Sequence, residues 1–162
     1  MFLAVLLASL SLHVHPSEID SLLRELDMSI RNRPQYTLKR QEQIDALQRK
    51  LRLSHSDQER YDLYRELFGK YRSYRMDSAL WVANQRVELA KRMKNPLYIR
   101  SAELNIAEVM IGVAMYKEGL EILDGIKSAD LDASGVSYYY YQYHQVYTLM
   151  ADYAFSDQMK EH

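Results

Sequence analysis

The stretch that decides the fold covers residues 74–96 and reads YRMDSALWVANQRVELAKRMKNP. Its apolar residues recur every three or four positions, at Leu80, Ala83, Val87, Ala90 and Met93. This spacing predicts one apolar face of a helix that begins near Asp77. Asn95 and Pro96 predict a stop followed by a new helix, because proline disfavours helix in the residue before it but is tolerated in a first turn.

The same periodicity extends through most of the chain on both sides of this stretch. Helices are expected after Ser17, over residues 35–53, after Ser56, from Asp77, from Pro96, around residues 120–126, and over residues 137–155. The last helix is expected to turn inward the face that carries Tyr140, Tyr141, His144, Tyr147, Met150, Ala151 and Ala154. The composition agrees, since 5 glycines and 3 prolines in 162 residues are too few for the turns of a many-stranded fold. Residues 136–141 have a strand-like composition, but they lead into helical periodicity and are expected to be helical.

Two parts of the chain match each other at an offset of 40 to 42 residues. Tyr74, Asp77, Ala79 and Leu80 correspond to Tyr116, Glu118, Gly119 and Leu120. The pattern resembles the tetratricopeptide (TPR) repeat, in which a tyrosine precedes a small residue at the start of the second helix. We therefore expect an all-α fold in which antiparallel helix pairs stack as a short TPR-like α-solenoid. The alternative is an irregular helical bundle, since the offset exceeds the usual repeat of about 34 residues.

A stack of this kind has a built-in place for a ligand. No helix pair can bury its apolar face alone, so neighbouring pairs share one continuous core. The stack curves, and the first helices of successive pairs line its concave face. That face is expected to accept a peptide or a partner helix.

The N-terminus carries a localisation signal. Residues 1–12 read MFLAVLLASLSL, an apolar run too short to span a bilayer, which takes about 20 residues. We interpret residues 1–15 as a secretory signal peptide and residues 16–162 as the helical-repeat domain. A buried first helix is the alternative, because no lysine or arginine precedes the run.

Several function classes lack the residues that they need. The net charge of −1 provides no general attraction for a nucleic-acid backbone, and the absence of cysteine excludes thiolate metal sites and cysteine nucleophiles. No histidine spacing is typical of a metal site, and no carboxylate pair or serine motif suggests catalysis. We therefore predict no catalytic residue, no metal, no cofactor and no enzymatic activity.

Aromatic and basic side chains form the candidate interaction surface. Tyrosine crowds the start of the last helix, and Trp81 and two arginines lie near the central repeat. The candidate residues are Tyr138, Tyr139, Tyr143, Trp81, Arg86 and Arg100. Tyrosine suits recognition because it offers a large area and a polar tip, although packing between helices is the plainer explanation. The arginines are expected on a solvated face, with an anion-binding patch as the alternative.

Four stretches together resemble one known family. They are SEIDSLLRELDMSIRNRPQYTLKRQEQIDALQRKL (17–51), ERYDLYRELFGKYRSYRMDSALWVANQRVELAKRM (59–93), LNIAEVMIGVAMYKEGLEIL (104–123) and YYYYQYHQVYTLMADYAFSDQ (138–158). They are similar to the N-terminal region of exported TPR-like, membrane-anchored regulators of Bacteroidetes. The resemblance implies a periplasmic domain, followed in the native protein by a transmembrane helix and a cytoplasmic region for transcriptional regulation. It implies no catalytic residues.

Two functions of different classes follow as hypotheses. The first is a non-catalytic protein-interaction or sensory domain of an exported regulator. It would bind a protein or peptide, and it would reach the membrane only through a segment beyond His162. The second is a structural scaffold that self-associates, for example as a homodimer, through its tyrosine-rich last helix. Nucleic acid is not an expected partner of this region in either case.

Overall fold

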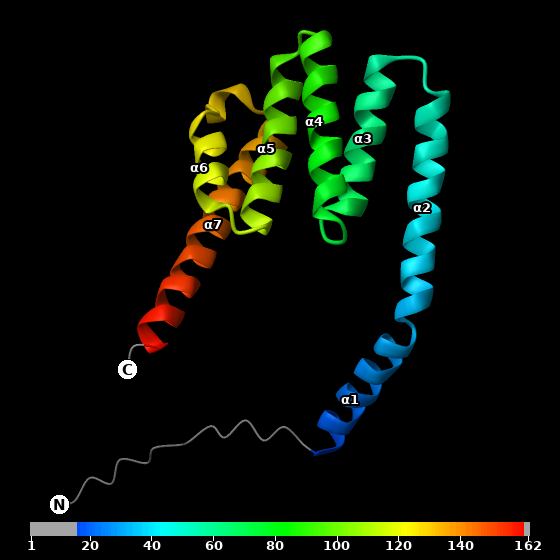
Figure 1. Cartoon of the computed structure of the whole chain (residues 1–162), viewed down its shortest axis with the longest axis vertical. Coiled ribbons are helices and arrows are strands. Elements are labelled where there is room, and N and C mark those ends of the chain that lie inside the picture. The colour runs from blue at the N-terminus through cyan, green and yellow to red at the C-terminus, as the bar shows by residue number, and fades with distance from the viewer. Residues whose placement is uncertain (1–15, 161–162) are drawn as a thin grey trace, which may run out of the picture. The chain divides into compact units, whose positions relative to one another are not determined.

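Helices follow one another with short connections throughout the computed structural model (Figure 1). The structure describes residues 16–160, with side chains for residues 19–153, and the expected signal peptide at residues 1–15 lies outside these ranges. The elements are α1 (Pro16–Arg31), α2 (Arg33–Leu53), α3 (Asp57–Tyr71), α4 (Met76–Arg92), α5 (Pro96–Gly112), α6 (Tyr116–Asp124), the 3₁₀-helix η1 (Ser128–Asp130) and α7 (Ala133–Lys160). The described residues contain no strand, so the all-α prediction is confirmed and residues 136–141 are helical.

Side-chain caps start several helices where the sequence predicts. Ser56 Oγ accepts a hydrogen bond of 3.1 Å from the Glu59 amide at the start of α3. Asn95 Oδ1 accepts one of 3.2 Å from the Tyr98 amide at the start of α5. Asp132 Oδ1 accepts one of 2.7 Å from the Gly135 amide, and for this reason α7 begins earlier than expected from Ser137.

Two of the helix ends share one unusual backbone conformation. Lys94 after α4 and Ala114 after α5 both have positive φ, at 52° and 63°. In each case the next residue donates back across the helix end, from Asn95 N to Ala90 O at 3.1 Å and from Met115 N to Met110 O at 2.8 Å. These are Schellman-type ends, in which a left-handed residue reverses the chain, and they join α4 to α5 and α5 to α6 within three residues.

Small residues let the paired helices approach closely. Ala79 lies four residues after Arg75, the N-cap of α4, and Gly119 lies four residues after Met115, the N-cap of α6. Both are buried, and a Cβ built on Gly119 would lie 2.8 Å from Ile111 Cγ1. The predicted match of Ala79 with Gly119 is therefore confirmed.

The predicted tyrosine match in the same repeat is wrong. Tyr74 precedes the N-cap of α4, whereas Tyr116 is the first residue of α6. Counting from the two N-caps, the residue that corresponds to Tyr116 is Met76. The two tyrosines therefore occupy different places relative to their helices.

The described residues fall into two compact units, one up to residue 41 and one from residue 42 onward. In the first unit, the apolar side chains of α1 are solvent-exposed, at Ile19, Leu22, Leu23, Leu26, Met28 and Ile30. In the second unit, neighbouring helices share their buried residues. No helix in the described part of the chain is both long enough and apolar enough to cross a bilayer.

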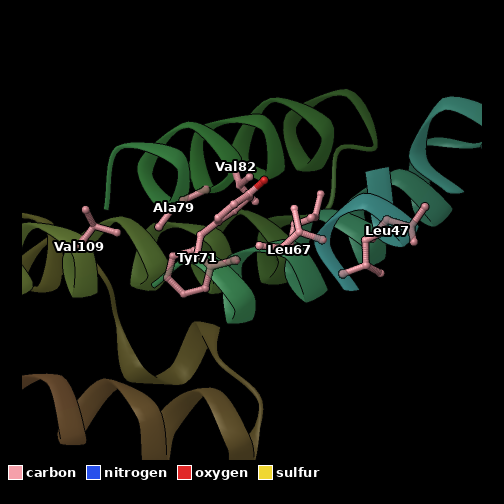
Figure 2. Packing of buried hydrophobic residues seen from close by; sticks show 10 residues of the cluster. Leu47, Leu67, Tyr71, Ala79, Val82 and Val109 are labelled. Atoms are coloured by element: carbon pink, nitrogen blue, oxygen red, sulfur yellow. The ribbon is translucent and has the colours of Figure 1, made fainter. Parts of the chain in front are cut away.

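The core of the second unit joins one hairpin to the next. Figure 2 shows side chains from four helices meeting in one cluster, at Leu47 (α2), Leu67 and Tyr71 (α3), Ala79 and Val82 (α4), and Val109 (α5). A second cluster joins α5 and α6 to Val146 of α7. Because α4 lies between α3 and α5, residues on more than one of its faces are buried (Figure 1). Such sharing of buried residues between neighbouring pairs is typical of helical repeats.

The buried face of α7 differs from the expected one. Gln142 and Val146 are buried, whereas Tyr140, Tyr141 and Tyr147 are exposed. The prediction failed because tyrosines occur on every side of this helix, so apolar periodicity could not distinguish its inner face.

Candidate binding groove

A groove of about 400 Å³ crosses the first helices α3 and α5 and the start of α7. It is lined by Tyr61, Asp62, Arg65, Phe68, Gly69 and Arg72 of α3, Arg86 of α4, Leu97, Tyr98, Ser101, Leu104 and Asn105 of α5, and Asp132, Ser134, Gly135 and Tyr138 at the start of α7. First helices therefore provide most of its wall, as expected for the concave face of a stack.

Arg86 lies at the floor of the groove and is only 1 % exposed. The expectation of Arg86 on a solvated basic face is therefore wrong. Its helix position explains the burial, since Arg86 follows the buried Ala83 by three residues and precedes the buried Ala90 by four. The side chain consequently points between α3 and α5, where its guanidinium meets residues of both helices.

The hydrogen-bond partners of the Arg86 guanidinium are neutral groups. One terminal nitrogen donates to Asn105 Oδ1, and the other donates to the hydroxyl of Tyr61 at 2.8 Å. Nε has no hydrogen-bond partner, and no described carboxylate lies within ion-pair distance of Arg86. Burial lowers the pKa of Arg86, but an arginine remains protonated in a protein. The floor of the groove therefore holds a positive charge without a paired anion.

A pair of tyrosine rings supports this cation. Tyr61 and Tyr98 stack with their ring centroids 4.5 Å apart and their planes 9° from parallel. Arg86 Cζ lies 4.4 Å from the centroid of the Tyr61 ring, a cation–π distance. The Tyr61 hydroxyl donates to the Tyr98 carbonyl at 2.9 Å, and burial raises the pKa of Tyr61. These contacts fix the position of Tyr61, whose hydroxyl oxygen also accepts a hydrogen bond from Arg86.

Glu108 of α5 holds the three walls of the groove together. Arg72 of α3 donates to its carboxylate at 3.0 Å, and the Tyr138 hydroxyl of α7 donates to the other oxygen. Burial raises the pKa of Tyr138, and the neighbouring Glu108 carboxylate raises it further. The charge of Arg72 is therefore paired, in contrast to that of Arg86.

The structure brings only two of the six predicted surface residues into the groove, Arg86 and Tyr138. Tyr139 and Tyr143 pack against the core between α5 and α6, and the Tyr143 hydroxyl donates to Asp124 at 2.5 Å. For these two tyrosines, packing between helices is the better description. Burial, followed by the Asp124 contact, raises the pKa of Tyr143.

The other two predicted residues lie outside the groove. Trp81 is 55 % exposed, makes an edge contact with Tyr64 and borders a different pocket beside α2. Arg100 donates to Glu103 at 2.8 Å within α5, so its charge is paired.

Tyr61 and Asn105 were not singled out in the sequence, although both contact Arg86. A signal for Asn105 existed, because it is a polar residue between Ala102 and Val109 on a buried stretch of α5. In the described residues, no group of three or more histidine, aspartate or glutamate side chains is arranged to hold a metal ion.

Comparison with known proteins identifies the family of this chain. A family model described as the SusR N-terminal TPR domain matches residues 30–162. No curated protein and no solved structure matched the chain. TPR domains are protein-interaction modules and are generally not enzymes, which agrees with a groove on the first helices.

Proposed function

This chain belongs to the family of SusR N-terminal TPR domains, and we propose that it binds an extended polypeptide segment in the groove across α3, α5 and α7. The groove itself carries the proposal. Its walls come from three helices tied together by Glu108, so it is formed before a ligand arrives. A preformed groove binds more tightly because little conformational entropy is lost on binding.

The proposal is tested by filling the groove without disturbing its walls. A Cβ added at Gly69 of α3 meets no atom within 4 Å, so Gly69→Tyr should place a ring in open space. Peptides of about twelve residues, selected from a phage-displayed random library on the unmodified domain, should lose binding to Gly69→Tyr and keep it with Gly69→Ala. Equal binding to all three proteins would contradict the proposal.

We further propose that this domain is the non-catalytic sensory part of an exported, membrane-anchored regulator. The apolar run at residues 1–12 supports export, and the SusR family supports the regulatory role. Alkaline phosphatase fused to the C-terminus of the chain would be active in cells only after export. An inactive fusion of normal abundance would contradict the periplasmic location.

Self-association is a second candidate, supported by the outer face of α7. Tyr140, Tyr141 and Tyr147 are each more than half exposed, a quantity of aromatic surface that suits a dimer contact. Light scattering during dilution through the micromolar range tests it. A dimer that Tyr141→Ser dissociates would support the scaffold, and a monomer throughout would exclude it.

A further inference from the structure

The floor of the groove carries a charge that the folded chain leaves unpaired. Three arginines and two aspartates line the groove, at Arg65, Arg72, Arg86, Asp62 and Asp132. Arg65 pairs with Asp62 at 3.4 Å, and Arg72 pairs with Glu108 at 3.0 Å. The Asp132 carboxylate accepts from the Gly135 amide and the Ser134 hydroxyl at the start of α7. Arg86 is thus the arginine of the groove that has no acidic partner among the described residues.

An unpaired buried cation is costly, and proteins seldom keep one without a reason. Removing an ion from water costs several kcal/mol, and an opposite charge normally offsets that cost. Here the direct contacts are with neutral groups, the Asn105 amide and the hydroxyl and ring of Tyr61, and Nε remains without a partner. Asp62 attracts the guanidinium without forming an ion pair with it. The electrostatic field of Arg86 is weakly screened inside the protein and extends into the groove.

We propose that the polypeptide bound in this groove is acidic and that one of its carboxylates lies over Arg86. This inference rests on the proposed function and names the chemistry of its ligand. Asn105 and Tyr61 act as positioning residues, since they hold the guanidinium at the floor of the groove. Arg65 also lines the groove, but its charge is paired with Asp62, so the unpaired positive charge is that of Arg86. A segment that places a glutamate or aspartate side chain over Arg86 therefore matches the floor of the groove.

Two fluorescein-labelled decapeptides test the inference by fluorescence anisotropy. One alternates glutamate with alanine, and the other alternates glutamine with alanine. The chain should bind the glutamate peptide more tightly by roughly tenfold to a hundredfold, the range expected for hydrogen bonds to a charged group. Its affinity should also fall as salt is added. Equal affinity for the two peptides, or no binding of the glutamate peptide, would overturn the inference.

Variants of the chain test whether Arg86 provides the charge that binds the glutamate peptide. Arg86→Met should reduce the affinity for the glutamate peptide to that for the glutamine peptide. Arg92→Ala is the matched control, because Arg92 lies on the same helix but is exposed and pairs with Asp57 outside the groove. The control should bind like the unmodified chain. Unchanged binding by Arg86→Met would overturn the inference.

Asn105→Asp provides a second variant that does not remove the arginine. It should place a carboxylate beside the Arg86 nitrogen that now donates to Asn105 Oδ1, without a change of shape. The new carboxylate would then neutralise Arg86 within the chain. The melting temperature of the variant should be no lower than that of the unmodified chain, and its affinity for the glutamate peptide should be lost. Undiminished glutamate binding by a folded Asn105→Asp chain would overturn the inference.

Gly69→Tyr separates the failure of this inference from the failure of the proposed function. Peptides that bind regardless of charge but are excluded by Gly69→Tyr would leave the polypeptide groove in place and overturn only its acidic ligand. Peptides that bind Gly69→Tyr as well as the unmodified chain would overturn both.

Discussion

The interior of the hairpins and the floor of the groove are both buried, but they are built from opposite kinds of side chain. Where paired helices approach, the contacts are made by small residues such as Ala79 and Gly119. At the floor of the groove, α4 and α5 bury Arg86 and Asn105. The first arrangement removes apolar surface from water, so it stabilises the fold. The second leaves a polar atom unsatisfied, which indicates a role other than stability.

The largest effect is expected from enlarging a small residue in a hairpin. In Gly119→Ala, the new Cβ would lie 2.8 Å from Ile111 Cγ1, near the base of a buried side chain that cannot move away freely. Overpacking of this kind costs about 1–3 kcal/mol of unfolding free energy. Urea denaturation followed by circular dichroism measures it.

Gly69→Ala is the matched control for that change, since it is also a helical Gly→Ala substitution but meets no atom within 4 Å. It should stabilise the chain by up to about 1 kcal/mol through helix propensity alone. If the two substitutions changed stability alike, close helix approach at Gly119 would not be a determinant of the fold.

A gain of stability is expected at the ends of α4 and α5. Lys94 and Ala114 have positive φ, a conformation that costs an L-residue about 1–2 kcal/mol and glycine almost nothing. Lys94→Gly and Ala114→Gly should therefore each raise the unfolding free energy by about 1 kcal/mol. The gain is limited because glycine also increases the conformational entropy of the unfolded chain. Lys94→Ala keeps the strain and should show no comparable gain in the same denaturation experiment.

Almost no change in the unfolding free energy is expected when Arg86 at the floor of the groove is replaced by methionine. Arg86→Met removes a buried cation that has no paired carboxylate, so no opposite charge is left behind. Asn105 and the Tyr61 hydroxyl each lose one donor, but Tyr61 keeps its own hydrogen bond to the Tyr98 carbonyl. The unfolding free energy should change by less than about 1 kcal/mol, because buried ions can often be replaced by apolar groups at little cost. A loss as large as that of Gly119→Ala would mean that the floor is a stability element after all.

The smallest expected effect is the pH-dependent contribution of a surface ion pair to stability. Arg92 donates to Asp57 at 2.8 and 3.1 Å and holds the pKa of that carboxyl below its usual value. A lowered folded-state pKa gives stability above the unfolded pKa near 3.8, and this stability is lost as the pH falls through the folded pKa. The pair is exposed, so its contribution is small and screened by salt. The melting temperatures of the unmodified chain and Asp57→Asn should differ slightly at pH 7 and converge below pH 3.

The sequence predicts the hairpins well because local rules determine them. Ser56 and Asn95 cap their helices, Pro96 begins α5, and Ala79 and Gly119 occupy matching positions. Each of these features depends on neighbours a few residues away, so a single sequence contains the information.

The groove was harder to predict because its parts come from distant positions. The sequence predicts Arg86 on a solvated face, although its spacing from Ala83 and Ala90 puts it on a buried one. Its contacts with Tyr61 and Asn105 join residues 25 and 19 positions away, which periodicity within one helix cannot reveal.

The inner face of α7 was missed for another reason. Its tyrosines are all amphipathic, so Tyr138 and Tyr141 look alike in the sequence, yet the first packs inward and the second is exposed. Only the packing of α5 and α6 against α7 decides between them.

The central claim, that the first helices form the binding face, is tested most directly by paramagnetic broadening in an NMR spectrum. A spin label on a library-selected peptide of about twelve residues should broaden the amide signals of Gly69, Asn105 and Gly135, one from each wall of the groove. The signals of Trp81 on α4 and Glu121 on α6 should be broadened less, because neither residue lines the groove. Broadening at Trp81 and Glu121 with sharp signals from the three groove residues would contradict the account.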